Sequence, residues 1–167
     1  MRISARADYA LRAAAELAAA EPGRFVKGET IAAAQRMPHR FVENILGGLA
    51  HAGLVESQRG ADGGYRLARP AQLISLADVI RAVEGPLATV RGAVPEAVDY
   101  HGHATALRDV WFAVRANLRA VAEHVSVADL AAGTIPARIA EIAADPDARR
   151  RRAAPVSRSR ARRSPRR

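Results

Sequence analysis

The stretch from Glu29 to Ala68 constrains the fold most, because helix and strand signals alternate along it over a short distance. Met37-Pro38-His39 separates two segments of helical spacing, as a helix stop followed by a restart. Two short strand-like segments follow, with a glycine-rich turn between them. The expected elements are a helix at 29–36, a helix at 40–52, a strand at 54–58 and a strand at 65–68. This order predicts a winged helix-turn-helix.

Helical spacing also occurs on both sides of this unit. Ser4, Ser75 and Ser126 are candidate N-caps, and Asp78 completes a capping-box pattern with Ser75. The further expected helices cover residues 5–20, 76–83, 105–125, 127–132 and 134–143. Residues 87–103 lack periodicity and are expected to form a loop. The predicted fold class is therefore mainly α with a small β-hairpin wing, followed by a long C-terminal helix.

The positive charge of the chain is concentrated in its C-terminal tail. The net charge is +9, and residues 146–167 alone carry ten arginines and one acidic residue. Residues 1–145 are therefore neutral, although residues 1–70 hold a basic excess. The tail is rich in arginine, serine, proline and alanine, so we expect it to be disordered and to attract nucleic acid without sequence preference. The expected segments are a winged helix-turn-helix at 1–70, a connecting helix and loop at 71–104, a long helix with short C-terminal helices at 105–145, and the tail at 146–167.

The composition also excludes several classes of protein. The chain has no cysteine, so it has no disulfide and no thiolate ligand for a metal or cluster. The opening residues lack the apolar centre of a signal peptide, and no apolar run approaches the length of a membrane span. We therefore expect a cytoplasmic, nucleoid-associated protein without a membrane partner.

The segment 40–52 is the candidate recognition helix of the predicted unit. Its expected core face consists of Phe41, Ile45, Leu46 and Leu49, with Val42 at the margin. In the preceding helix the expected buried face consists of Ile31, Ala32 and Ala34. The opposite face of the candidate recognition helix offers polar side chains in its first turns, where such helices reach base edges. By residue type, Arg40 can address guanine, Asn44 adenine and Glu43 cytosine.

The wing and the chain start add candidate backbone contacts. Glycines in the wing permit positive φ and a close approach to a phosphate chain, and Arg59 at the base of the glycine-rich turn can enter a narrow minor groove. The alternatives are an ordinary exposed hairpin and arginines that are merely solvated. The candidate DNA-binding residues are Arg2, Arg6, His39, Arg40, Glu43, Asn44, Arg59, Gly63, Gly64 and Tyr65.

The long helix expected at 105–125 carries an apolar stripe at three- and four-residue steps. The stripe consists of Leu107, Val110, Trp111, Val114, Leu118 and Val121. Winged helices usually read two half-sites through a two-fold axis, so we interpret this stripe as a homodimer seam. The alternative is that it packs only within its own subunit.

The loop before this helix holds residue types that can bind a divalent metal. Glu96, Asp99, His101 and His103 offer oxygen and nitrogen ligands. The alternative is a polar loop with incidental histidines, since no predicted strand or helix orients them. We therefore expect no metal and no other cofactor.

Most of the chain, from residue 1 to about residue 133, resembles the IscR/NsrR/CymR-type family of winged helix-turn-helix bacterial transcriptional regulators. The residues that carry the resemblance are Met1-Arg2-Ile3-Ser4 with Asp8-Tyr9-Ala10, Gly53-Leu54-Val55, Arg59-Gly60 with Gly63-Gly64-Tyr65, Val79 to Gly85, and Ala128-Asp129-Leu130. Each motif is weak alone, but their order and spacing are specific. The resemblance implies an N-terminal winged helix, a long C-terminal helix that crosses its mate in a homodimer, and repression at inverted-repeat promoters.

The chain departs from that family in its sensing loop. Cluster-binding members carry three cysteines before the long helix, whereas the corresponding loop here, residues 88–104, contains none. A cysteine-ligated iron–sulfur cluster is therefore excluded, and the family's sensing mechanism does not carry over. A small organic effector, a partner protein or no effector remain open.

The leading hypothesis is a homodimeric, sequence-specific transcriptional regulator that binds double-stranded DNA. We expect it to act as a repressor and not as an activator. The alternative is an architectural protein that coats DNA through the basic tail. The neutrality of residues 1–145 argues against that alternative. An enzyme is not expected, because the glycines lack the following Lys-Ser/Thr of a phosphate loop and no nucleophile constellation is recognisable.

Overall fold

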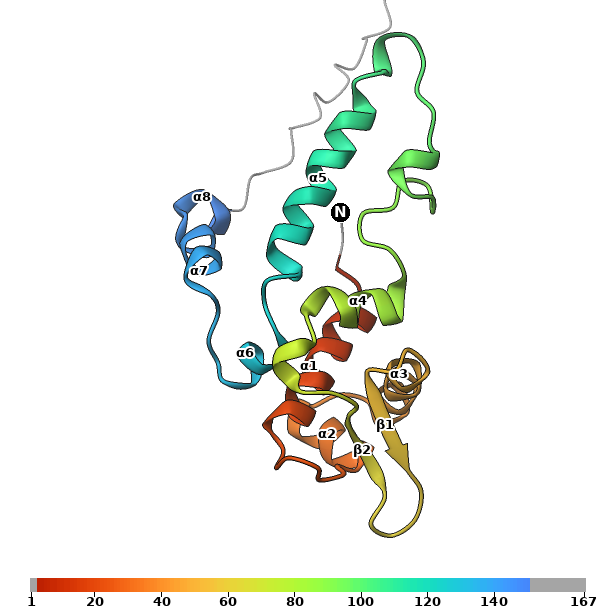
Figure 1. The fold of residues 1–167 in the computed structure, drawn as a ribbon, viewed down its shortest axis with the longest axis vertical. Coiled ribbons are helices and arrows are strands. Elements are labelled where there is room, and N and C mark those ends of the chain that lie inside the picture. The colour runs from red at the N-terminus through yellow and green to blue at the C-terminus, as the bar shows by residue number, and fades with distance from the viewer. Residues whose placement is uncertain (1–2, 151–167) are drawn as a thin grey trace, which may run out of the picture. The chain divides into compact units, whose positions relative to one another are not determined.

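A computed structural model gives the fold and describes residues 3–150. The elements are α1 (Ala5–Ala19), α2 (Gly28–Gln35), α3 (His39–His51), β1 (Val55–Gln58), β2 (Gly64–Leu67), α4 (Leu76–Glu84), α5 (Leu107–Ala122), α6 (Val127–Ala131), α7 (Ala137–Ala144) and α8 (Pro146–Arg149), with short 3-10 turns at Ala71–Leu73, Pro95–Ala97 and Gly102–Ala104 (Figure 1). The chain divides into two compact units after Pro136. Arg2 and most of the predicted tail lie outside the described residues.

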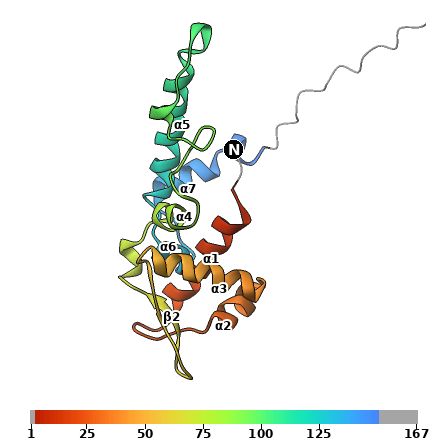
Figure 2. The ribbon, with the colours of Figure 1, turned by 90° about the vertical axis from the view of Figure 1, so that its right-hand side faces the viewer.

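The larger unit is built on α1, which packs against α2, α3, α4 and α6. The face that α1 buries is mostly alanine, so neighbouring helices can approach it closely. Fully buried side chains around it include Ile31, Val42, Ile45, Leu46, Leu49, Ile74, Val79 and Val127. In two views, the wing and α5 lie at opposite ends of this unit, with α1 and α4 between them (Figures 1 and 2).

Two expectations about this core were wrong. Val42 is fully buried, whereas Phe41 is 42% exposed and rests edge-on against Tyr9, with 5.7 Å between the ring centroids. The centre of the buried face of α3 is therefore rotated by one residue from the predicted position. Ala34 is exposed, and Met37 is buried after α2 has ended.

The ends of the helices follow their local sequence. Ser4 accepts a hydrogen bond from the Ala7 N–H at 3.0 Å, and Ser75 and Ser126 form complete capping boxes. Arg36 ends α2 in the left-handed region, with the Met37 N–H donating to the Ala32 carbonyl at 2.8 Å. This pattern is a Schellman motif, which turns the chain sharply between α2 and α3.

The wing is a two-stranded antiparallel hairpin that a third segment extends. Val55 pairs with Leu67 and Gln58 pairs with Gly64. Val26 bridges to Tyr65 through two backbone hydrogen bonds of 2.8 Å, in which each residue donates to the other. The segment before α2 therefore fixes the hairpin to the helix-turn-helix.

The long helix is shorter than predicted. It covers Leu107–Ala122 instead of residues 105–125, because the chain beyond it pairs with the start of α4. The Leu76 N–H donates to the Val125 carbonyl at 2.9 Å, and the Val127 N–H donates to the Ile74 carbonyl at 2.8 Å. Val125 is buried in this extended segment.

The second unit contains α7 and α8. Residues 146–149, expected to begin the tail, form α8, with the Asp145 carboxylate accepting from the Asp147 N–H at 2.8 Å. Pro146 occupies the first turn, where its missing N–H is tolerated. Within residues 3–150, no helix is both long enough and apolar enough to cross a membrane.

Candidate nucleic-acid interface

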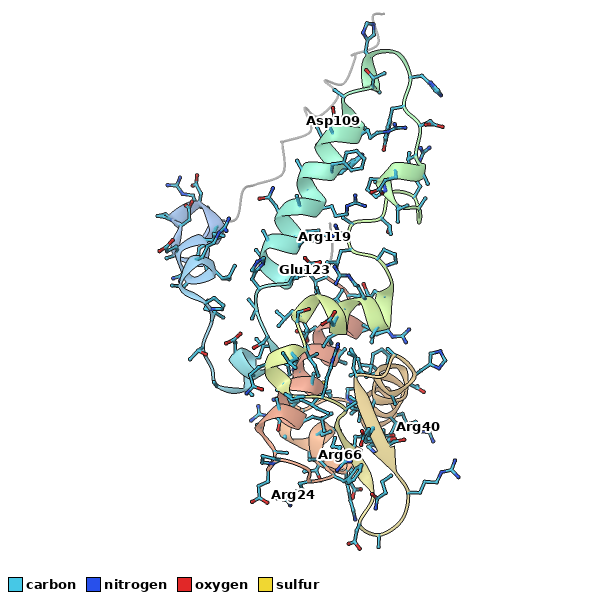
Figure 3. All side chains as sticks on the ribbon, in the orientation of Figure 1. Arg24, Arg40, Arg66, Asp109, Arg119 and Glu123 are labelled. Atoms are coloured by element: carbon cyan, nitrogen blue, oxygen red, sulfur yellow. The ribbon has the colours of Figure 1, made fainter. Side chains whose placement is uncertain are left out.

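The outer face of α3 presents polar side chains in its first two turns. His39, Arg40 and Asn44 are exposed, on the side opposite the buried face of the helix. Among residues 3–150, neither Arg40 nor Asn44 has a hydrogen-bond or ion-pair partner. Arg40 on α3 and Arg66 on the wing lie at the same end of the unit (Figure 3). Arg40 and Asn44 are therefore free to contact an external ligand.

Glu43 differs from its neighbours because it already has partners within the protein. Its carboxylate accepts a hydrogen bond of 2.7 Å from the Tyr65 hydroxyl, and its other oxygen lies 3.3 Å from His39 Nε2. Burial of the Tyr65 hydroxyl and its hydrogen bond to Glu43 together raise the pKa of Tyr65 to about 12. The first role of this contact is to hold the wing against α3.

A cleft of about 410 Å³ lies between the start of α2, the start of α3 and the wing. Its lining residues are Lys27, Gly28, Glu29, His39, Glu43, Ser57, Gln58, Arg59, Gly60, Gly63, Gly64 and Tyr65. The structure thus brings six of the ten candidate DNA-binding residues to one cleft. It adds Lys27 and Gln58, which sequence reasoning missed because no local pattern links residues before α2 to the wing.

The wing glycines are required by packing within the protein. A Cβ at Gly64 would lie 2.4 Å from the Val26 carbonyl oxygen, and one at Gly63 would lie 2.3 Å from the Gln58 carbonyl oxygen. By contrast, Gly60 has φ +103° and nothing near its Cβ position. For the wing glycines the sequence predicts positive φ, which Gly60 and Gly64 have, and a close approach to phosphate. The structure gives a sufficient internal reason for two of them.

Two arginines near the interface have distinct settings. Arg6 lies against α3, since a Cβ at Gly48 would be 3.6 Å from its Nη2 atom. Arg66 is bound within the protein: its guanidinium lies 2.7 Å from Glu56 and stacks 4.6 Å above the Phe25 ring. Arg6 therefore adds positive charge beside α3, whereas Arg66 stiffens the base of the wing.

The apolar stripe on α5 is incompletely covered. None of the side chains of α5 is fully buried. Val110 is 50% exposed, and the other five stripe residues, Leu107, Trp111, Val114, Leu118 and Val121, are half-buried. The turn at Pro95–Ala97, in the loop between α4 and α5, packs against the helix, so the stripe is partly covered within its own subunit.

The loop side chains considered as metal ligands have other partners or lie apart. Glu96 forms a bidentate ion pair with Arg115, and this contact lowers the pKa of Glu96 to about 2. Asp99 accepts a hydrogen bond of 2.8 Å from Arg108. In the part of the chain that the structure describes, no three histidine or carboxylate side chains converge as a metal site would require. The structure therefore does not bring His101 and His103 together with Glu96 and Asp99.

Comparisons with known proteins find related transcriptional regulators. Residues 3–133 match the Rrf2 family model, described as an iron-dependent transcriptional regulator. The chain is 48% identical to Rv1287 of Mycobacterium tuberculosis over 87% of this chain and 90% of that protein. It is 31% identical to the HTH-type transcriptional regulator CymR of Bacillus subtilis, over 80% of this chain and 92% of CymR.

Solved structures of related regulators match the fold over most of the chain. The solved structure of CymR, the global cysteine regulator of B. subtilis, matches with a TM-score of 0.68 at 30% identity, over 80% of this chain and 98% of CymR. The structure of IscR from T. potens matches with a TM-score of 0.63 at 25% identity, over 92% of this chain and 94% of IscR. The predicted resemblance and the predicted winged-helix fold are both confirmed.

Proposed function

Because the chain belongs to the Rrf2 family of helix-turn-helix transcriptional regulators, which are not enzymes, we propose that it is a homodimeric repressor that binds inverted-repeat operators. The observation that carries the proposal is the exposed pair Arg40 and Asn44 on α3, which have no partners among the described residues and lie on the helix whose start lines the cleft beside the wing. Each protomer would place α3 in the major groove of one half-site.

The division of roles follows from the contacts within the protein. Arg40 and Asn44 would read base edges, because their donors and acceptors are unused. Lys27, Arg6 and Arg59 would contact phosphates and set the register on the duplex. Glu43 would contact a base only if its hydrogen bond from Tyr65 broke or if its carboxylate accepted from Tyr65 and the base together. DNA contact at Glu43 would therefore also shift the wing.

The stripe on α5 supports the dimer. An apolar helix face with no fully buried residue is costly in water, and a second copy of the same helix would cover it through a two-fold axis. Such an arrangement would set the spacing of the two α3 helices. It would therefore also set the spacing of the operator half-sites.

The family's iron dependence does not fit the residues of this chain. There is no cysteine to hold a cluster, and two of the loop carboxylates are bound by arginines. We therefore propose that this regulator works without an iron–sulfur cluster and without a metal in its loop.

The test compares Arg40→Ala with Arg91→Ala, which removes the same charge from an exposed turn in the loop after α4. DNA sites selected by the wild-type protein would be used to measure affinity for the consensus and for single-base variants. We expect Arg40→Ala to weaken consensus binding by about 1–3 kcal/mol and to relax preference at one position in each half-site. Arg91→Ala should change neither. Equal effects of the two substitutions would contradict the assignment of α3 as the reading helix.

A reporter assay distinguishes repression from activation. With the selected site placed over a promoter, loss of the protein should raise expression. Analytical ultracentrifugation of wild-type protein and of Val110→Glu tests the dimer, since a charge at the most exposed residue of the stripe should convert dimers to monomers.

A further inference from the structure

A second cleft, of about 370 Å³, lies between the end of α4, the loop that follows it, and α5. Its lining residues are Arg81, Gly85, Pro86, Leu87, Val94, Arg115 and Arg119. None of them lines the cleft beside the wing. The DNA-binding role proposed above gives this cleft no task.

The cleft collects more positive than negative charge. Glu96 binds Arg115, and Glu123 pairs with Arg81 and lies 3.8 Å from Arg119 Nε. Three guanidinium groups therefore face two carboxylates.

One further carboxylate, that of Asp78, lies within ion-pair distance of a cleft arginine. Asp78 lies 3.8 Å from Arg81, but it also lies 3.5 Å from Arg69, whose charge offsets it. Arg119 is the least satisfied of the three cleft arginines, because its side chain is 49% exposed and its contact with Glu123 is longer than a hydrogen bond. An excess guanidinium in a concave site favours an anion from solution.

The remaining wall of the cleft is apolar. Pro86, Leu87 and Val94 come from the loop after α4, whereas Arg115 and Arg119 come from α5 and Arg81 from α4. A site lined by both guanidinium groups and hydrocarbon suits a ligand that has a charged group and an apolar body. The volume is in the range of small-molecule sites.

The loop that forms this wall is held in a disfavoured backbone conformation. Ala88 has φ +57° and Arg91 has φ +53°, and both are non-glycine residues in the left-handed region. Such residues are concentrated at ligand clamps and switch segments. Arg115 and Arg108 fasten the loop to α5 through Glu96 and Asp99.

We propose that this cleft binds a small amphiphilic anion, with one phosphate or carboxylate group on an apolar body. Arg119 and Arg81 would take the anionic group, which would compete with Glu123 for both guanidinium groups. Leu87 and Val94 would cover the apolar body. Anion binding at this cleft does not depend on the proposed DNA-binding function; only an effect of the anion on DNA affinity would rest on that function.

Trp111 is the single tryptophan of the chain and lies one helical turn before Arg115, so its fluorescence reports on this part of α5. The full-length protein would be titrated with hexyl phosphate, hexanoate and the neutral analogue hexanol. We expect saturable binding of at least one of the two anions and binding of hexanol that is at least roughly tenfold weaker. The two anion arms distinguish a phosphate site from a carboxylate site.

The matched variants are Arg119→Gln in the cleft and Arg24→Gln, which removes the same charge from an exposed residue after α1, outside the cleft lining. Arg59→Gln controls for anion binding at the wing. We expect Arg119→Gln to weaken binding by about tenfold or more, and the two controls to keep wild-type affinity. Circular dichroism would verify that all three variants fold; Arg81→Gln serves as the second cleft variant if Arg119→Gln does not.

The proposal is overturned if no saturable change occurs, if hexanol binds as tightly as the anions, or if Arg59→Gln weakens binding while Arg119→Gln does not. DNA affinity measured with and without the bound anion is a separate readout. If operator binding fails altogether, the fluorescence result still decides whether the cleft binds an anion.

Discussion

Replacing Gly64 with alanine should damage the protein far more than the same change at Gly60, although both glycines belong to the wing. Gly64 has φ +149°, and its absent Cβ would lie 2.4 Å from the Val26 carbonyl oxygen. Gly60 has φ +103° and open space at its Cβ position. The pair therefore separates backbone strain, which both variants suffer, from steric overlap, which only Gly64→Ala suffers.

The magnitude follows from the contacts that the overlap would break. The Val26 carbonyl accepts a hydrogen bond from the Tyr65 N–H, and the Val26 N–H donates to the Tyr65 carbonyl, both at 2.8 Å. Losing two such bonds costs about 2 kcal/mol, in addition to roughly 1–3 kcal/mol of strain at a disfavoured φ. We expect Gly64→Ala to lower the free energy of unfolding by about 3–5 kcal/mol, and Gly60→Ala by the strain alone.

The assay is urea unfolding followed by circular dichroism, with thermal unfolding as a second measurement. The difference of about 2 kcal/mol between the variants corresponds to roughly 4–8 °C in Tm for a domain of this size. Equal destabilisation by the two substitutions would refute the claim that the Val26–Tyr65 bridge fixes the wing to the helix-turn-helix.

Three further predictions concern single residues. Gly53 ends α3 at φ +71° with nothing near its Cβ position, so Gly53→Ala should cost about 1 kcal/mol in urea unfolding. The pKa of Tyr65 is raised from 10.0 to about 12, so the contribution of its hydroxyl to stability is present below pH 10 and is lost as the pH rises to 12. Tyr65→Phe should remove this loss of stability, and it should also remove the tyrosinate absorbance step near pH 12. The Arg115 contact lowers the pKa of Glu96 from 4.5 to about 2, so its stabilising effect is lost as the pH falls from 4.5 to 2; Glu96→Gln should flatten acid unfolding in that window, and an unchanged acid profile would count against the ion pair.

The parts of the fold that sequence predicted are those with local causes. The caps at Ser4, Ser75 and Ser126 lie within three residues of the N–H groups that they satisfy, so the sequence pattern contains both partners. The helix-turn-helix and the wing are likewise defined by helix breaks and glycines along one continuous stretch.

The errors have long-range causes. Helix α5 ends at Ala122 because Val125 pairs with Leu76, a partner far away in the sequence. Phe41 is rotated out of the core because Tyr9 on α1 offers its ring an edge-on contact. Periodicity gives the apolar side of a helix, but the position of the neighbouring helix decides which residue is at its centre.

Residue types along the sequence predict the candidate DNA-binding face. The structure shows which of these side chains already have a partner within the protein. The sequence groups Glu43 with Arg40 and Asn44, yet only Glu43 is half-buried and bound by Tyr65. The sequence separation of the two partners hides this contact from any local pattern. The second cleft was missed for the same reason, since Arg81 and Arg119 come from different helices.

The most direct test of the central claim is genome-wide binding by the purified protein at physiological salt, for the full chain and for a variant that ends at Asp145. The proposed function predicts discrete sites that share an inverted repeat and are retained by the shortened protein, because Arg40 and Asn44 on α3 would supply the specificity. Uniform coating of DNA that disappears when residues 146–167 are removed would contradict it, and would show that the arginine-rich segment, with its ten arginines, is the principal DNA-binding element.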